Sequence, residues 1–387
     1  MIATANRLKS VQEYYFATKL REVRNLMNAG KPIINAGIGS PDLLPPDHVI
    51  PALTAALQDP KAHAYQSYLG LPELREGMAS FYKSHYNVDL DSETEIIPLM
   101  GSKEGILHIS LAFLNKGDQV LIPDPGYPTY ASATKLCEAQ PVTYNLTAAN
   151  NWMPDFEALE QLDLSKVKLM WTNYPNMPTG AAGSRAVFEK LVSFARKHNI
   201  LVVNDNPYSC VGYEKKMSIH QVEGSLECAL ELNSISKTFN MAGWRVGMLT
   251  GNADVLKEVL KVKTNMDSGM FYGIQKGAIA ALKTDENWLA EQDKIYQNRR
   301  ELTLKVAETL DLKPEPQTGG LFVWCKLPQG KEDDKKFVDE VLHNQDIFIT
   351  PGSIFGMNGE GYVRFSLCVK EEEIAIMLDR VSKKDRT

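Results

Sequence analysis

The sequence lacks a cysteine framework, an excess of basic residues and a long hydrophobic run, and each absence excludes a class of protein. An odd, dispersed set of cysteines without CxxC spacing argues against disulfides and for a reducing compartment. The five residues concerned are Cys137, Cys210, Cys228, Cys325 and Cys368. The net charge of −6 provides no basic surface for nucleic acid or for an anionic membrane.

No uninterrupted apolar stretch approaches the ~18–20 residues that a membrane-spanning helix needs. Residues 1–19 mix polar, charged and aromatic side chains and lack the apolar core of a signal peptide. The sequence therefore predicts a soluble, cytoplasmic protein that binds neither membrane nor nucleic acid. It also predicts no metal site.

The order of the expected elements indicates an α/β fold with two domains. A chain of 387 residues is too long to fold around one simple hydrophobic core, so a large and a small domain are expected. Between residues 96 and 250, short apolar runs alternate with helical segments, which predicts a mostly parallel sheet flanked by helices. The strand-like runs 321–326 and 361–367 lie among helical segments, which predicts a smaller α+β domain.

We place the large domain at residues 45–285, and the small domain at residues 286–387 together with an N-terminal arm, residues 1–44. The arm carries the aromatic residues Tyr14, Tyr15 and Phe16. It lacks the strongly basic face of a membrane-surface helix. We therefore expect it to pack against the body of the protein or against a partner subunit.

The stretch 229–250 contains the most informative residue, Lys237. A short apolar run ends just before this lysine, at the position where open α/β sheets place their ligands. An amine held there can form a Schiff base with a carbonyl. Ser234, Ser236 and Arg245 add the hydroxyls and the guanidinium that suit a phosphate group. We interpret the stretch as a lysine aldimine next to a phosphate site, which is what pyridoxal phosphate requires. The alternative is a surface lysine in a polar loop.

A second element of phosphate-binding type follows the short strand expected at residues 96–100. Gly101, Ser102 and Lys103 come next and open a helix that runs to about Leu114. Free N–H groups and the helix dipole face an anion in such an arrangement. The Walker A spacing is absent, and a capped helix without a ligand is the alternative.

Three further loops, at residues 123–128, 173–180 and 205–208, combine proline with polar or aromatic residues at strand ends. If the strands are parallel, these loops lie at the same sheet edge as Lys237. Together with them, the stretch 234–247, Ser-Ile-Ser-Lys-Thr-Phe-Asn-Met-Ala-Gly-Trp-Arg-Val-Gly, resembles the lysine motif of class I/II, fold-type I aminotransferases. The other motifs match in order and spacing, so the resemblance covers residues from about 14 to 366.

The resemblance implies pyridoxal 5′-phosphate as cofactor and a role for each matching residue. Lys237 forms the internal aldimine, Asp205 pairs with the pyridine nitrogen and keeps it protonated, and Tyr208 donates to the ring 3′-oxygen. Tyr127 stacks on the ring. The cofactor's phosphate is bound by Gly101, Ser102, Lys103, Ser234, Ser236 and Arg245.

The resemblance also implies how substrate and partner bind. Arg364 holds the α-carboxylate of the substrate by a bidentate pair, and Ile38 and Gly39 cover the substrate. Tyr65 matches a tyrosine that reaches the phosphate from the other subunit. The protein is therefore expected to be a homodimer with shared active sites. Its reaction would be transamination between an L-amino acid and a 2-oxo acid with ping-pong kinetics.

One position departs from the family pattern, because Met177 stands where an asparagine usually precedes Pro-Thr-Gly. That asparagine bonds the 3′-oxygen and the substrate carboxylate, whereas a thioether is a weak acceptor and cannot donate. We expect Tyr208 alone to serve the 3′-oxygen, unless Asn176 substitutes through a one-residue shift of the loop.

The choice of substrate is less defined than the reaction. The arm and the stretch 265–275 resemble the branch of LL-diaminopimelate and aspartate aminotransferases. That stretch has no arginine for a side-chain carboxylate, so a dicarboxylic donor is not specified. Two alternatives remain, a C–S lyase that uses pyridoxal phosphate on the same fold and a catalytically silent protein that binds the cofactor.

Overall fold

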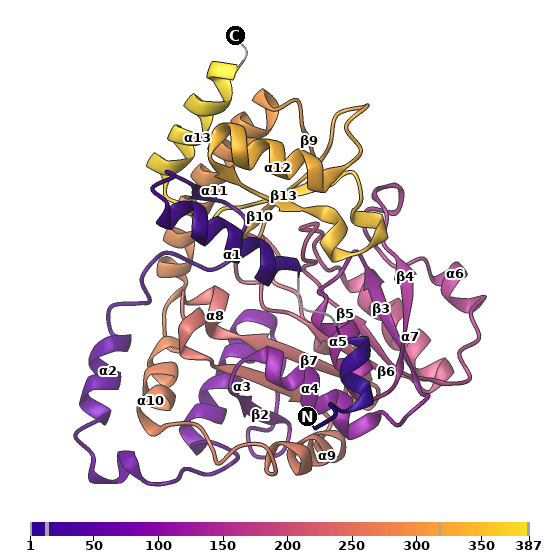
Figure 1. Cartoon of the computed structure of the whole chain (residues 1–387). Helices are drawn as coiled ribbons and strands as arrows, with labels where there is room; N and C mark the ends of the chain where they lie inside the picture. Colours follow the sequence, from indigo (N-terminus) through magenta and orange to yellow (C-terminus); the bar gives the residue numbers. More distant parts are fainter. Residues whose placement is uncertain (1, 12–14, 317–318, 385–387) are drawn as a thin grey trace.

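A computed structural model describes residues 2–11, 15–316 and 319–384, so Tyr14 of the arm lies outside the described residues. Within these ranges the chain forms a seven-stranded central sheet in the order β2-β8-β7-β6-β5-β3-β4 (Figure 1). Its strands are β2 (Ile96–Leu99), β3 (Gln119–Asp124), β4 (Gln140–Asn145), β5 (Val167–Thr172), β6 (Leu201–Asp205), β7 (Ala229–Ser234) and β8 (Gly247–Gly251).

The central sheet is mostly parallel, as the sequence predicts. Strands β4, β3, β5, β6 and β7 pair parallel with one another in that order. Strand β8 runs antiparallel to both of its neighbours, β2 and β7. The loops that follow β3, β5, β6 and β7 therefore meet at one edge of the sheet, where ligands bind in open α/β folds.

Alternate residues of the strands pack into different cores. In β5, Leu169 and Trp171 belong to one hydrophobic cluster, whereas Met170 belongs to another. In β2, Ile97 and Ile96 likewise belong to two different clusters. Successive side chains of a strand point to opposite faces, so both faces of the sheet are covered. One face packs against α4 (Ser102–Phe113), α5 (Thr129–Leu136) and α9 (Ala253–Lys263); the other packs against α3 (Pro72–Tyr86), α7 (Arg185–His198) and α10 (Tyr272–Ala281).

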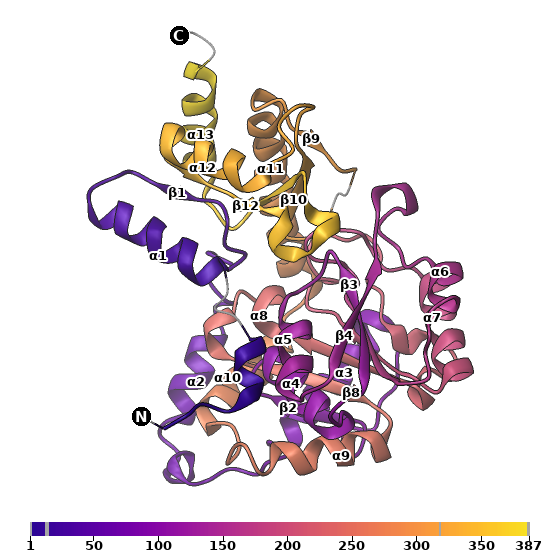
Figure 2. The same cartoon turned by 45° about the vertical axis from the view of Figure 1, so that its right-hand side comes forward.

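The C-terminal part has its own antiparallel sheet, in the order β12-β13-β10-β9. Its elements are β9 (Lys313–Pro314), β10 (Phe322–Lys326), β12 (Thr350–Pro351), β13 (Tyr362–Ser366), α11 (Glu286–Thr309), α12 (Asp334–Gln345) and α13 (Glu371–Lys384). Figures 1 and 2 show these helices gathered at the end of the molecule away from the central sheet. The fold is α/β with an added α+β part, whereas the domain boundaries at 45 and 285 remain a prediction.

The N-terminal segment packs against this C-terminal part. Strand β1 (Ile34–Asn35) pairs in parallel with β11 (Ile347–Phe348). In α1 (Tyr15–Asn28), Lys19 forms an ion pair with Asp339 at 2.6 Å, and the ring of Phe16 lies 6.3 Å from that of Phe348. The segment thereby carries Phe16 and the stretch after β1 to the sheet edge where the loops meet.

The remaining helices are short and lie around the central sheet. They include α2 (Val49–Ala56), which packs against α10, α6 (Phe156–Glu160), and the single turn α8 (Ile235–Thr238). None of the helices in the described ranges combines the length and the apolar composition that crossing a membrane requires.

Candidate active site

A cavity of about 490 Å³ lies where the strand ends of the central sheet meet the C-terminal part. Its size is typical of small-molecule sites. The structure brings most of the sequence-predicted residues to its wall: Ile38, Gly39, Ser102, Lys103, Tyr127, Met177, Asp205, Tyr208, Ser234, Ser236, Lys237, Arg245 and Arg364. Gly101, Asn176 and Tyr65 are not part of this wall.

Lys237 lies in the single turn α8, directly after β7. The turn is capped by Ser234, whose Oγ accepts a hydrogen bond of 3.0 Å from the backbone N–H of Ser236. The Nζ of Lys237 donates to the carbonyl oxygen of Gly39. Desolvation lowers the pKa of Lys237, and the charge of Arg364 lowers it further. An amine with a lowered pKa is more often neutral, and the neutral form is the nucleophile and the base.

Asp205, the last residue of β6, has one satisfied and one unsatisfied carboxylate oxygen. Its Oδ2 accepts a hydrogen bond of 2.9 Å from the hydroxyl of Tyr130, whose ring stacks on Trp171 with a centroid distance of 5.0 Å. Its Oδ1 is buried without a hydrogen-bond partner among the described residues. Burial raises the pKa of Asp205 to about 7, against the opposing effect of the Tyr130 hydrogen bond. Such an oxygen suits a protonated nitrogen of a ligand.

The start of α4 and the side chain of Arg245 form an anion site. Gly101 has φ +91°, and a Cβ on it would lie 2.0 Å from Nη2 of Arg245. The missing side chain therefore lets the guanidinium approach the start of the helix. Ser102 begins the helix, so its N–H belongs to the first turn, where helices bind anions. A guanidinium beside the start of a helix suits an anion such as the phosphate group of the expected cofactor.

Arg364, on β13, is a buried cation with an incomplete set of partners. Its Nη2 donates to the carbonyl of Gly37 at 2.9 Å, and its Nη1 donates to Sδ of Met177 at 3.1 Å. Its Nε has no hydrogen-bond partner, and no carboxylate in the described part of the chain pairs with it. Burial lowers the pKa of Arg364 to about 10. A buried guanidinium without a counter-ion is costly, so the site favours an anionic ligand.

Aromatic rings hold this guanidinium in place. The carbon Cζ of Arg364 lies 4.0 Å from the ring centroid of Phe322 and 4.7 Å from that of Phe355. Tyr208 packs edge-on against Phe322, with ring centroids 5.8 Å apart. Burial raises the pKa of Tyr208, so its hydroxyl stays protonated and can donate a hydrogen bond.

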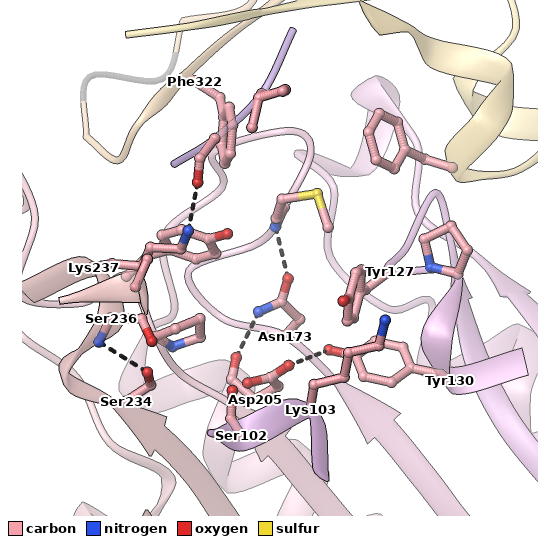
Figure 3. Close-up of a pocket in the computed structure, with 18 of the residues that line it drawn as sticks. Ser102, Lys103, Tyr127, Tyr130, Asn173, Asp205, Ser234, Ser236, Lys237 and Phe322 are labelled. Carbon is pink, nitrogen blue, oxygen red and sulfur yellow. Dashed lines mark hydrogen bonds between the residues drawn. The ribbon is translucent and has the colours of Figure 1, made fainter. Parts of the chain in front are cut away.

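Figure 3 shows Lys237 and Tyr127 on opposite sides of the cavity, with Asn173 and Asp205 between them on its floor. The ring of Tyr127 packs edge-on against Tyr130, with centroids 5.7 Å apart. A flat ring placed between the two sides would meet the unsatisfied Oδ1 of Asp205 at one edge. The arrangement therefore fits a planar aromatic cofactor with a ring nitrogen.

The structure differs from the expectation for the amide in the loop after β5. Asn176 turns into its own loop, where its Oδ1 accepts a hydrogen bond of 2.7 Å from Oγ1 of Thr179. Asn173 lines the cavity instead, and it donates to the carbonyl of Asp205 at 2.5 Å and accepts from the N–H of Met177 at 2.8 Å. Asn173 was identifiable as the first polar residue after a buried strand. Tyr130 carried no local signal, because it looks like an ordinary helix residue.

Tyr65 lies outside the cavity and is 92% exposed. No hydrogen bond to its hydroxyl occurs among the described residues.

The comparisons with known proteins match this geometry. A family model for aminotransferase class I and II covers residues 31–381. The LL-diaminopimelate aminotransferase of Halothermothrix orenii is 38% identical over 98% of this chain and 98% of its own length. That of Nitratidesulfovibrio vulgaris is 38% identical, with the same coverage of both chains.

Among solved structures, substrate-bound BacF from Bacillus subtilis superposes with a TM-score of 0.95 at 35% identity, over 100% of this chain and 98% of that one. The cavity, the family match and the relatives agree on one cofactor and one reaction. The chain therefore belongs to the class I and II aminotransferases, which transfer amino groups with pyridoxal 5′-phosphate.

Proposed function

We propose that this transaminase works through Lys237, Asp205 and Arg364, and that its substrates are an L-amino acid and a 2-oxo acid. The observation that carries the proposal is that these three residues line one cavity. A lysine of lowered pKa, a buried carboxylate with an unpaired oxygen and a buried guanidinium without a counter-ion lie together there. Each is unfavourable alone, and each is relieved by one part of a cofactor–substrate pair.

The residues that would hold pyridoxal phosphate are those with a matching chemical group. Asp205 Oδ1 would accept the hydrogen bond of the ring nitrogen, Tyr127 would cover one ring face and Tyr208 would donate to the 3′-oxygen. The phosphate would lie at the start of α4, among Ser102, Lys103, Ser234, Ser236 and Arg245. When bound, the cofactor supplies an aldehyde for the amino group and a ring that takes up electrons from the Cα–H bond.

The chain's own residues then orient the substrate and move one proton. Arg364 receives the α-carboxylate, because its unpaired Nε and its buried charge favour an anion at that point. The Nζ of Lys237 accepts the proton from the substrate Cα, which a neutral amine can do. In this structure Nζ donates a hydrogen bond to the carbonyl of Gly39. A 2-oxo acid carries the same carboxylate, so it binds Arg364 in the second half-reaction.

We also propose that the enzyme is a homodimer in which Tyr65 reaches the neighbouring phosphate site. Large apolar side chains are exposed on one part of the molecule, around α2, the Tyr65 loop and the stretch before α10: Leu44, Ile50, Leu57, Tyr65, Tyr68, Met266 and Phe271. The loop at Gly269 packs on the backbone of Gln66, so these segments are neighbours. Exposed apolar side chains on neighbouring segments support an interface with a second copy. We propose a cytoplasmic location as well, since all five cysteines are free thiols.

The half-reaction tests the proposed function directly. The enzyme is loaded with pyridoxal phosphate and mixed with an amino donor, without any acceptor, while the cofactor absorbance is followed. Stoichiometric conversion to the amine form, reversed by a 2-oxo acid, is expected. LL-diaminopimelate is the first donor to include, because the relatives are named for it.

The same experiment separates the two alternatives, for which the relatives give no support. A C–S lyase would release pyruvate and ammonia from cystathionine without any acceptor. A silent cofactor-binding protein would leave the absorbance unchanged with every amino acid. Either result would overturn the proposed function.

A further inference from the structure

The outer part of the cavity has an apolar wall, which we define as Phe16, Ile38, Tyr127, Pro128, Ile354 and Phe355. These residues come from three separate parts of the chain: the N-terminal segment, the loop after β3 and the 3₁₀ turn Gly352–Phe355. All but Phe355 are only partly buried, so they expose apolar surface to the cavity. Covering such surface with an apolar ligand is favourable.

The charged lining residues are not members of this wall. Lys237, Asp205, Arg245 and Arg364 are assigned to the amine, the ring nitrogen, the phosphate and the α-carboxylate. Lys103 belongs to the first turn of α4, next to the anion site. Within the apolar wall, the only side-chain polar group is the hydroxyl of Tyr127.

Two parts of the wall are tied together by a hydrogen-bond network around Asp124. Its two carboxylate oxygens accept from the backbone N–H groups of Met357 and Asn358 at 3.1 and 2.9 Å. The N–H of Gly126 donates to the carbonyl of Phe355 at 2.8 Å. These contacts set the turn that carries Ile354 against the loop that carries Tyr127. This part of the apolar wall is therefore formed before a ligand arrives. A preformed wall favours ligands whose shape fits it.

We propose that the preferred amino donor has a bulky apolar side chain, aliphatic or aromatic, and that this side chain lies against the apolar wall. The inference rests on the proposed function and names the substrate class of the same site. A donor with a second charged end, such as LL-diaminopimelate or aspartate, brings an ammonium or a carboxylate to a wall whose six side chains carry no charge. No interaction with the six side chains of the wall compensates for the hydration that this charged group loses.

Lys103 is a further cation in the lining of the cavity. Figure 3 shows it on the same side of the cavity as Tyr127 and Tyr130. The donors to be tested therefore include amino acids with a second carboxylate or a second ammonium group. If an acidic donor binds Lys103, the enzyme will prefer aspartate or glutamate.

The test is the donor-only half-reaction of the holoenzyme with phenylalanine, leucine, methionine, alanine, aspartate, glutamate and LL-diaminopimelate. We expect the second-order rate constants of phenylalanine and leucine to exceed those of aspartate and LL-diaminopimelate at least tenfold. A preference for LL-diaminopimelate or for either acidic donor would overturn the proposal while leaving transamination intact. If none of the seven donors converts the cofactor to its amine form, the proposed function would be overturned instead.

A variant pair links the preference to the wall. Ile354→Ala should lower the ratio of the phenylalanine to the alanine rate constant at least threefold, because apolar contact with the longer side chain is lost. Ile376→Ala, which truncates a 46% exposed residue on α13, should leave that ratio unchanged. If Ile354→Ala leaves the ratio unchanged as well, the side chain of the donor does not lie against this wall.

Discussion

The sulfur atom of Met177 accepts a hydrogen bond from Nη1 of Arg364 at 3.1 Å, and both residues line the cavity. The family pattern has an asparagine at this position, whose amide both accepts and donates. The thioether only accepts, and weakly. It leaves the guanidinium aligned by one backbone carbonyl and two rings.

The first prediction concerns this pair. Met177→Asn should raise kcat/KM for amino donors about tenfold, or ~1.4 kcal/mol, because the amide holds Arg364 better and donates to the carboxylate. Met177→Leu is the matched control, since it keeps the volume, removes the acceptor and should lower kcat/KM. Steady-state kinetics and the cofactor spectrum measure both. An unchanged rate and spectrum in Met177→Asn would contradict the role given to this position.

The second prediction concerns pH and Asp205 in the enzyme freed of cofactor. Burial raises the pKa of Asp205 to about 7, above the ~3.9 of an unfolded chain. The folded state then binds more protons, so this residue's contribution to stability is fully present below about pH 4 and is lost as the pH rises through about 7. The loss is at most ~4 kcal/mol.

Thermal unfolding of the cofactor-free protein between pH 5 and 8 measures this loss. Asp205→Asn cannot titrate, so its melting temperature should fall less over the same range than that of the unaltered protein. Parallel pH dependence in the two proteins would show that Asp205 does not carry the buried proton.

The third prediction separates binding from chemistry at Lys237. Lys237→Ala should reduce turnover about a thousandfold or more, because the amine that would accept the Cα proton is lost. Pyridoxamine phosphate forms no bond to the lysine, so its affinity should change less than about threefold. Lys261→Ala, which removes an exposed ion pair with Glu258 at 2.7 Å, serves as the control. Near-normal turnover of Lys237→Ala would refute the proposed mechanism.

The fourth prediction tests shared active sites by complementation. Lys237→Ala and Tyr65→Ala chains are each expected to be poorly active as homodimers. In a mixed dimer, one site combines Lys237 of one chain with Tyr65 of the other and is therefore intact. When equal amounts of the two variants are unfolded and refolded together, about half of the dimers are mixed, so activity should rise toward about a quarter of the normal value. If Tyr65 serves its own chain, mixing will give no gain.

The fifth prediction concerns the close approach of Arg245 to Gly101. Gly101→Ala should weaken binding of pyridoxal phosphate at least tenfold, because the new Cβ would displace Arg245, whose Nη2 lies 2.0 Å away. Gly117→Ala is a matched control. Gly117 has φ +89°, close to the +91° of Gly101, but no atom lies within 4 Å of its Cβ position.

Both substitutions strain the backbone by ~1 kcal/mol or more, so both should lower the melting temperature. Only Gly101→Ala should change cofactor affinity, measured by equilibrium dialysis. Equal affinities in the two variants would place the phosphate away from the start of α4.

Local patterns determined much of this protein. The alternation of apolar runs and helical segments specified the parallel strands, and the polar residues after β3, β5, β6 and β7 indicated the edge that binds ligands. Lys237 was identifiable because its neighbours in sequence, Ser234 and Ser236, are also its neighbours in space. Periodicity and turn chemistry act over a few residues, so they are visible without a structure.

Contacts between distant parts of the chain were decided only by the tertiary structure. Tyr130 pairs with Asp205, the rings of Phe322 and Phe355 enclose Arg364, and Asn173 lies in the cavity where Asn176 does not. The apolar wall likewise joins three segments that share no local pattern. Such contacts depend on how side chains pack once the sheet and the C-terminal part have met, and packing of that kind leaves no periodic trace in the sequence.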